Sequence, residues 1–360
     1  MKTVSIDLSK VQAYLEQLFG QPVASLQAVV IGGEESVKGY GYGKVLLLNF
    51  DLGSEHKKLV LETMPAGPFG HEHFSDRAQT MLWKYPASQT LPRHAKSIDV
   101  GAFLTGGDMI SVGEAEEFFL LTEFKEGEGY FHDFDRLANA DMPEPLDEAR
   151  TLALSDYLVQ IHSVKHDEPG LYVRRIRELI GHGECLMGLT DSYPADFKVP
   201  GPLTLEEIEK KAVEWRWKIK SRTHRLCQVH GDFHPWNILF REDADFMTID
   251  RSRGEWGEAA DDLTALSINY IFFSLQHHGK LTAAYERLFN LFWDNYLTKT
   301  GDAEVLEVLQ PFYAWRGLVV ASPVWYPRLA PEVRAALFNF IGNVLNTERF
   351  DPARVNEYLG

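Results

Sequence analysis

Apolar residues recur at helical spacing near the start of the chain and at strand-like spacing directly after it. The first pattern predicts an amphipathic helix over 7–20, stopped by Gly20, with four apolar residues at three- to four-residue steps: Leu8, Val11, Leu15 and Leu18. Three short apolar runs then predict three β-strands, over 26–31, 44–50 and 58–64.

Further apolar patterns extend this prediction along the chain. A stripe that begins at Phe74 predicts a helix over about 72–85, which Pro86 should end. The run 118–124 has the apolar character of a buried strand. Beyond residue 146 helical spacing dominates, and the last helices are expected at about 263–276, 281–297, 303–322 and 331–346.

One polar stretch interrupts the helical half of the chain. Residues 229–237 read Val-His-Gly-Asp-Phe-His-Pro-Trp-Asn. Two short apolar runs around a charged turn follow, which predicts a β-hairpin. Such a hairpin would bring Asp250, at its far end, back beside Asp232 and Asn237.

Three such side chains suit phosphoryl transfer. That reaction needs a carboxylate to orient or deprotonate the attacking hydroxyl, and oxygen ligands for the metal ions that bridge the nucleotide phosphates. Mg²⁺ prefers hard oxygen ligands. We therefore expect Asp232 to be the base, with Asn237 and Asp250 as metal ligands. The alternative is a surface hairpin whose acidic residues have no chemical role.

The wording of this stretch resembles the catalytic loop of the aminoglycoside phosphotransferase and choline kinase group, which is related to the protein kinases. Five positions fall on the family pattern: His230, Asp232, His234, Asn237 and Asp250. Asp262, before Leu263, matches a family position at a helix start, where a carboxylate can cap N–H groups or hold the loop.

The resemblance implies a bilobal, kinase-like α+β fold. A small antiparallel-sheet lobe that covers the nucleotide would span 1–124, and a larger, mainly helical lobe with the catalytic and substrate-binding residues would span 125–360. A kinase covers the nucleotide phosphates with two strands joined by a glycine-rich turn, because glycine lets backbone N–H groups approach closely. Gly33, Gly39 and Gly41 would have this role here. The same glycines also fit ordinary turn chemistry. Backbone groups near Glu123 and Phe124 would bind adenine.

The third strand departs from the family pattern. Glu62 stands where the family carries a Lys or Arg that grips the phosphates. We expect a charge-swapped pair in which Arg77, on the following helix, faces Glu62 and reaches the phosphates. Two alternatives remain: Lys57 or Lys58 serves instead, or Arg77 is an ordinary surface charge.

Composition limits the partners. The chain has 36 basic and 52 acidic side chains and a formal net charge of −16, which argues against nucleic acid. An acidic field favours a cationic substrate, although acidity that only keeps the protein soluble explains the charge equally well. With no long apolar run, no secretory signal and two cysteines, Cys185 and Cys227, we expect a cytoplasmic protein without a membrane span.

These expectations combine into an ATP- and Mg²⁺-dependent phosphotransferase whose acceptor is a hydroxyl of a small molecule, aminoglycoside-like or an amino alcohol. Asp262 follows Asp250 by only twelve positions, which disfavours a protein acceptor. A sugar or metabolite kinase remains an alternative, as does a nucleotide-binding pseudokinase, which Glu62 makes plausible. The sequence does not distinguish ATP from GTP, and it is compatible with a homodimer.

Overall fold

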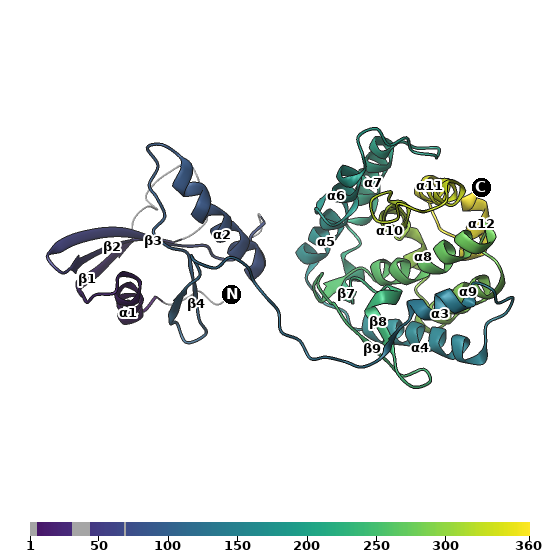
Figure 1. Cartoon of the computed structure of the whole chain (residues 1–360), viewed down its shortest axis with the longest axis horizontal. Coiled ribbons are helices and arrows are strands. Elements are labelled where there is room, and N and C mark those ends of the chain that lie inside the picture. Colours follow the sequence, from purple (N-terminus) through teal and green to yellow (C-terminus); the bar gives the residue numbers. More distant parts are fainter. Residues whose placement is uncertain (1–5, 31–43, 68–69) are drawn as a thin grey trace. The chain divides into compact units, whose positions relative to one another are not determined.

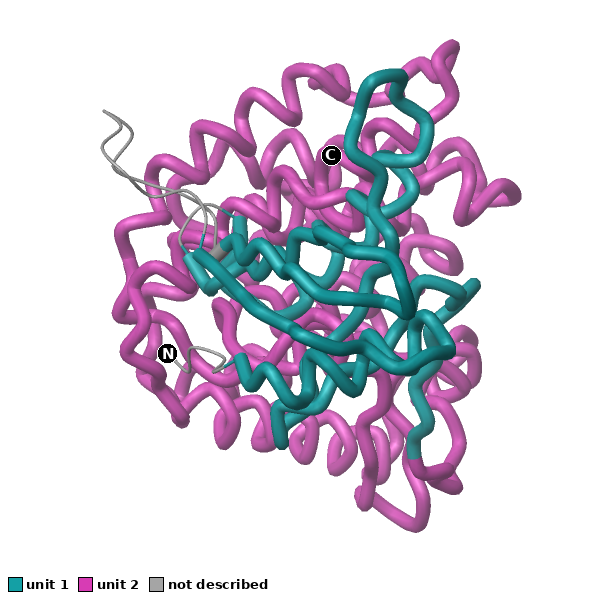
Figure 2. The backbone as a smooth tube through the Cα atoms, turned by 90° about the vertical axis from the view of Figure 1, so that its left-hand side faces the viewer, with its two compact units in different colours: residues 1–122 teal, residues 123–360 magenta. Residues whose placement is uncertain are grey.

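The computed structural model describes residues 6–30, 44–67 and 70–360. The chain divides into two compact units, Met1–Thr122 and Glu123–Gly360 (Figures 1 and 2). Each unit has a hydrophobic core of its own. Among the described residues every strand pair is antiparallel, and helices and strands are largely segregated along the chain. The fold class is therefore α+β, as predicted.

Unit 1 is built on a three-stranded antiparallel sheet in the order β1-β2-β3. Its elements are α1 (Leu8–Phe19), β1 (Val23–Val30), β2 (Lys44–Leu52), β3 (Glu55–Thr63), α2 (Phe74–Thr90), β4 (Gly101–Phe103) and β5 (Met109–Ser111). Alternate residues of β2 from Leu46 to Leu52 are buried, because successive side chains of a strand point to opposite faces. They pack with Val11 and Leu15 of α1. The predicted first helix and three strands are confirmed.

The second helix of unit 1 is longer than predicted. We expected Pro86 to end it, but α2 continues to Thr90 with Pro86 inside. A proline removes one backbone hydrogen bond and crowds the preceding turn, at a cost of about 3 kcal/mol in a helix interior. Ser88, in the turn after Pro86, is buried and bonded to Ser97 at 2.9 Å. Such packing offsets the cost, so the proline is tolerated.

The predicted buried strand over 118–124 is wrong. The segment has no strand conformation, and Phe119, Leu120 and Leu121 are between 87% and 92% exposed. Phe124 is 87% exposed as well. The segment spans the boundary between the units, and no strand of the described residues pairs with it. An apolar run forms a strand only when a neighbouring strand accepts its backbone hydrogen bonds.

Unit 2 is largely helical. Its longer helices are α3 (Phe131–Leu137), α4 (Pro145–His162), α5 (Pro169–Gly181), α6 (Leu186–Ser192), α7 (Leu205–Ile219), α8 (Ala259–His278), α9 (Ala283–Thr300), α10 (Gln310–Ala321), α11 (Pro331–Leu345) and α12 (Val355–Leu359). Helix α8 lies between α9 and α10 (Figure 1), and nearly all of its residues up to Leu275 are buried. It is the central helix of the unit.

Short strands and turns at one side of unit 2 carry the polar stretch. The strands are β6 (Glu128–Gly129), β7 (Cys227–Gln228), β8 (Ile238–Phe240), β9 (Phe246–Thr248) and β10 (Trp256–Gly257), and 3₁₀ turns at Thr223–Arg225 and Pro235–Asn237 precede β7 and β8. Two further 3₁₀ turns, Ala303–Glu307 and Pro352–Arg354, lie among the C-terminal helices. Strands β8 and β9 pair with Ile238 opposite Thr248, which confirms the predicted hairpin. Helix bounds differ from the prediction in three places: α8 begins earlier, at Ala259, α9 ends later, at Thr300, and the expected helix 303–322 is a 3₁₀ turn followed by α10.

Across the described ranges, none of the helices combines the length and apolarity that a bilayer-spanning segment requires.

Candidate active site

The segment Val229–Asn237, called here the Asp232 loop, is held through its backbone by Asp262 of α8. The Asp262 carboxylate is fully buried and accepts hydrogen bonds from the N–H groups of His230 at 2.8 Å and Gly231 at 2.7 Å. His162 Nε2 lies 3.2 Å away. Burial would raise the pKa of Asp262, but His162 and the backbone hydrogen bonds outweigh it and lower the pKa. An ionised carboxylate therefore fixes the start of the loop.

His230 connects this loop to the end of the hairpin. Its Nε2 lies 3.1 Å from the carbonyl oxygen of Ile249, and its Nδ1 accepts the N–H of Asp232 at 3.3 Å. Burial lowers the pKa of His230, so the ring is neutral near pH 7, with its proton on Nε2. His230 thus sets the loop against the residue that precedes Asp250.

Asp232 is surrounded by positively charged and ionisable groups. Its Oδ1 accepts a hydrogen bond from Arg316 Nη1 at 2.6 Å, and Arg253 Nε lies 4.0 Å from the same oxygen. His234 Nε2 is 3.6 Å from Oδ2. Burial alone would raise the pKa of Asp232, but His234, Arg316 and Arg253 outweigh it and hold the pKa well below its usual range. The side chain keeps 15% of its surface exposed, so an anionic oxygen remains open to a substrate.

Arg316 of α10 bridges two carboxylates. Besides Asp232, its guanidinium donates to Asp261 Oδ1 at 2.7 Å and to the carbonyl oxygen of Gly231 at 3.1 Å. Burial, the largest influence, raises the pKa of Asp261 to about 6 against the opposing charge of Arg316. The sequence analysis missed both residues. A single charged residue in the apolar run 310–321 was the available signal, because a lone charge on a buried helix needs a partner.

Asn237 and Asp250 stand at the two ends of the hairpin, and the backbone brings these ends together. The N–H of Ile249 donates to the carbonyl oxygen of Asn237 at 3.0 Å. Asn237 Nδ2 donates to the carbonyl oxygen of Asp232 at 3.1 Å, so the amide nitrogen is engaged within the loop. Asp250 is exposed and has a φ of 56°, a left-handed conformation uncommon for a non-glycine residue.

These two side chains offer an amide oxygen and a carboxylate. Mg²⁺ is usually held by one or two carboxylates together with phosphates and water, so the donors suit that ion. In the described residues no group of three or more His, Cys, Asp or Glu side chains could hold a metal by itself. A metal at Asn237 and Asp250 would therefore depend on ligands from its substrate.

His234 begins the 3₁₀ turn Pro235–Asn237. Its Nδ1 accepts the N–H of Trp236 at 3.2 Å, which caps the turn and leaves Nε2 on the side of Asp232. Trp236 stacks on Phe131 with ring centroids 5.6 Å apart. The turn is thereby fixed both by hydrogen bonding and by aromatic packing.

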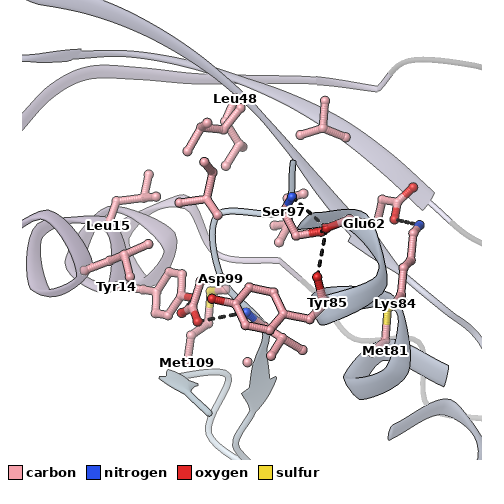
Figure 3. A pocket seen from close by; sticks show the side chains of 18 of the residues that line it. Tyr14, Leu15, Leu48, Glu62, Met81, Lys84, Tyr85, Ser97, Asp99 and Met109 are labelled. Atoms are coloured by element: carbon pink, nitrogen blue, oxygen red, sulfur yellow. Dashed lines mark hydrogen bonds and ion pairs between the residues drawn. The ribbon is translucent and has the colours of Figure 1, made fainter. Parts of the chain in front are cut away.

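In unit 1 the predicted Glu62–Arg77 pair is wrong. Glu62 of β3 forms its ion pair with Lys84 of α2, and Figure 3 shows the two side chains joined. Arg77 Nη1 instead donates to carbonyl oxygens at the start of α2, among them those of His71 at 3.0 Å and His73 at 2.8 Å. Lys84 follows Arg77 by two turns and lies on nearly the same helix face. Sequence periodicity identified the face of α2 that carries the cation, but not the position along the helix axis at which it meets Glu62.

The other residues predicted to bind the nucleotide are three glycines, two residues at the unit boundary and two lysines. Gly33, Gly39 and Gly41 lie outside the described residues. Glu123 and Phe124 belong to the extended, exposed segment at the unit boundary. Of the two alternative lysines, Lys57 pairs with Glu55. Lys58 is among the residues that line a cavity of unit 1, together with Glu62 and Lys84 (Figure 3).

Residues 102–307, more than half of the chain, match the model of a family described as the phosphotransferase enzyme family. No curated protein sequence matches the chain. Similar solved structures include a Plasmodium vivax ethanolamine kinase (14% identity, 93% of this chain and 80% of that chain, TM-score 0.36). A choline kinase from Cryptosporidium parvum is 13% identical over 93% of this chain and 86% of that chain, with a TM-score of 0.32.

An amicoumacin kinase in complex with AMP-PNP and Ca²⁺ is 12% identical over 97% of this chain and 98% of that chain, with a TM-score of 0.43. All three TM-scores lie below 0.5, so the family match alone carries the assignment.

Proposed function

Because the chain belongs to the phosphotransferase enzyme family, we propose that it transfers the γ-phosphoryl group of ATP to a hydroxyl of a small molecule. The observation that carries this proposal is the Asp232 loop. Asp262 and His230 fix the loop, and its aspartate stays ionised and partly open to solvent. The short segment between Asp250 and α8 leaves little room for the long loop that positions protein acceptors, which favours a small molecule.

Asp232 would orient the acceptor. Its oxygen accepts a hydrogen bond from the hydroxyl, whose oxygen then forms the bond to the γ-phosphorus as the bond to ADP breaks. Phosphoryl transfer passes through a loose transition state, so the hydroxyl keeps its proton until late. A carboxylate with a low pKa is a weak base, but it stays anionic and can hold the hydroxyl until its proton leaves, which suits this order of events. The hydroxyl proton passes to Asp232 and from there to solvent.

Asn237 and Asp250 would hold Mg²⁺ through the amide oxygen and the carboxylate. The ion supplies neutralisation of the phosphate charge when bound. Asp250 is held in position by the hydrogen bond between Ile249 and Asn237, and this fixed placement supports the assignment.

Lys84 is the residue that we assign to the nucleotide phosphates in unit 1. Glu62 on β3 would be a serious obstacle to phosphate binding if it were uncompensated, but its ion pair with Lys84 neutralises it. Lys84 is half exposed and carries donors beyond the one that Glu62 uses. Gly33, Gly39 and Gly41 keep their expected part in covering the phosphates, and the backbone near Glu123 and Phe124 its expected part in binding adenine.

The test is ATP consumption by the purified full chain with Mg²⁺ and a panel of hydroxylated small molecules. We expect turnover with one acceptor class. In Asp232→Asn, turnover with that acceptor should fall by about 10²–10⁴, the usual contribution of general-base catalysis, while Mg-ATP affinity changes little.

Turnover within a few-fold of wild type in Asp232→Asn would contradict the role of Asp232. Binding of Mg-ATP without turnover for any acceptor would instead support the pseudokinase alternative.

A further inference from the structure

Arg253 is a guanidinium placed beside Asp232 without a strong partner of its own. Its Nε is buried and makes no hydrogen bond, and it lies 4.0 Å from Asp232 Oδ1. Its Nη1 reaches only the Cys185 thiol and Glu184 Oε2, each at 3.6 Å. Glu184 is 68% exposed, so solvent screens that attraction. The side chain as a whole is 23% exposed, so an anionic partner would have to meet the guanidinium through its Nη atoms.

Packing, and not ion pairing, holds Arg253 in place. Its guanidinium lies 4.8 Å from the ring centroid of Trp315, which is itself buried. The base of the side chain packs against Gly231, where a Cβ would lie 3.0 Å from the Arg253 Cβ. Gly231 has a φ of 85°, so the loop needs glycine there. The side chain is therefore fixed before any substrate binds.

The charges around Asp232 indicate the sign of the charge that a substrate bound at this position carries. Arg316 is shared by Asp232 and Asp261, and Arg253 adds a second guanidinium. Arg316 is engaged by hydrogen bonds to both carboxylates, whereas Arg253 donates a hydrogen bond to neither, so Arg253 is the cation available to an added anion. One guanidinium balances one added negative charge. A carboxylate fits this better than a phosphate, which carries close to two charges and would stand near both aspartates.

We propose that Arg253 binds a carboxylate of the acceptor, so that the substrate is a short hydroxy acid. The inference rests on the proposed function and names its substrate class. A hydroxyl bonded to Asp232 and a carboxylate bonded to Arg253 would be held by neighbouring side chains, which approach to 4.0 Å between Asp232 Oδ1 and Arg253 Nε. The two groups must therefore be separated by only a few bonds. The chain's overall acidity does not set the charge of this pocket.

The experiment compares three acceptors that share one diol and differ in charge: glycerate, glycerol and 3-amino-1,2-propanediol. ATP consumption by the full chain should be highest in kcat/KM with glycerate and lowest with the amine. In Arg253→Met the KM for glycerate should rise by about 10- to 100-fold, the effect of losing a charged hydrogen bond, while the KM for glycerol stays nearly constant. Arg241→Met, an exposed arginine of the hairpin turn, is the matched control and should change neither value.

A second measurement does not depend on turnover. Calorimetric binding of glycerate in the presence of AMP-PNP and Mg²⁺ should weaken in Arg253→Met, and Arg253→Lys should retain part of the affinity. Unchanged glycerate affinity in Arg253→Met, absent glycerate binding to wild type, or a preference for the amine would overturn the inference.

A fall in kcat shared equally by glycerate and glycerol would also overturn it, because Arg253 would then act on the transferred phosphoryl group. Asp232→Asn distinguishes a failure of the proposed function from a failure of the role of Arg253. If it retains wild-type turnover the proposed function fails, whatever Arg253 binds.

Discussion

Arg316 carries a positive charge into an otherwise apolar helix and places it between two carboxylates. Breaking a buried ion pair by removing one partner commonly costs 3–5 kcal/mol, since it leaves an uncompensated charge behind. Arg316 therefore does more than hold the fold. Together with His234 it keeps Asp232 ionised, which is the form in which that residue meets a hydroxyl, and through Gly231 it also fixes the loop backbone.

Asp261 gives this arrangement a dependence on pH. In the folded chain its pKa is raised to about 6, from an ordinary value of 3.8. Between these values the folded state binds more protons than the unfolded state, so the contribution of Asp261 to the free energy of unfolding falls as the pH rises from about 4 to about 6. In Asp261→Asn this titration is absent. Urea unfolding from pH 4.5 to pH 7.5 should show wild type losing stability relative to the variant up to about pH 6 and then levelling off.

A stability difference between wild type and Asp261→Asn that stays flat over this range would show that Asp261 does not titrate there. Asp191→Asn, on an exposed carboxylate of α6, serves as the control for replacing an aspartate by asparagine.

Asp250 is the residue on which metal-dependent nucleotide binding should depend. Changing it to Ala removes an anionic oxygen ligand, so the affinity for Mg-ATP should fall by on the order of 10-fold while the fold is retained, because the side chain is exposed. Calorimetric titration with and without Mg²⁺ measures this. Equal Mg-ATP affinity in wild type and Asp250→Ala would remove Asp250 from the metal site.

At the scale of elements, two neighbouring elements bring each pair of site residues together. The β8–β9 hairpin brings Asn237 and Asp250 together because its turn is short and its register is fixed. In unit 1, β3 and α2 bring Glu62 to Lys84. Seven residues separate Lys84 from Arg77, about 10 Å along a helix axis, so the two cations share a face but reach different points of β3.

The pairing of β3 with α2 predicts which cation serves the nucleotide. Lys84→Met should weaken Mg-ATP binding by about 10- to 100-fold, since it removes the charged donor and leaves Glu62 uncompensated. Lys57→Met is the matched control, because Lys57 pairs with Glu55 at the other end of β3. Calorimetry on the three proteins decides between the lysines. Weaker binding in the Lys57 variant alone would reverse the assignment.

At the scale of the whole molecule, the two hydrophobic cores share no residue. One lies within unit 1, and the other runs from Tyr130 to Leu359 within unit 2. The family match, over residues 102–307, covers the end of unit 1 and most of unit 2. The loop, the hairpin and Arg316 all belong to unit 2, so one core positions the residues that we assign to the acceptor.

This separation predicts that unit 2 folds by itself. A chain of residues 125–360 should be helical and unfold cooperatively on heating, because it keeps its core intact. It should transfer no phosphoryl group, since Lys84 is absent. Circular dichroism and calorimetric unfolding test the first point. A non-cooperative transition would show that unit 1 is needed for the core of unit 2.

Patterns within a few residues were enough to predict the Asp232 loop, the hairpin after it and most helices and strands. The side-chain periods of 3.6 and 2 fix these features locally. In the structure one short hairpin connects Asn237, which follows Asp232 in the same loop, to Asp250, as the sequence spacing predicted.

Tertiary structure alone decided the partners of these residues. Arg316 follows Asp232 by 84 positions, and no local pattern relates the two. Lys84 takes the place predicted for Arg77 because the placement of α2 along β3 brings Lys84, and not Arg77, to Glu62. The apolar run 118–124 has the composition of a strand, but none of the strands in the described ranges pairs with it. Side-chain periods assign faces to elements, whereas the meeting of distant segments depends on how those faces pack.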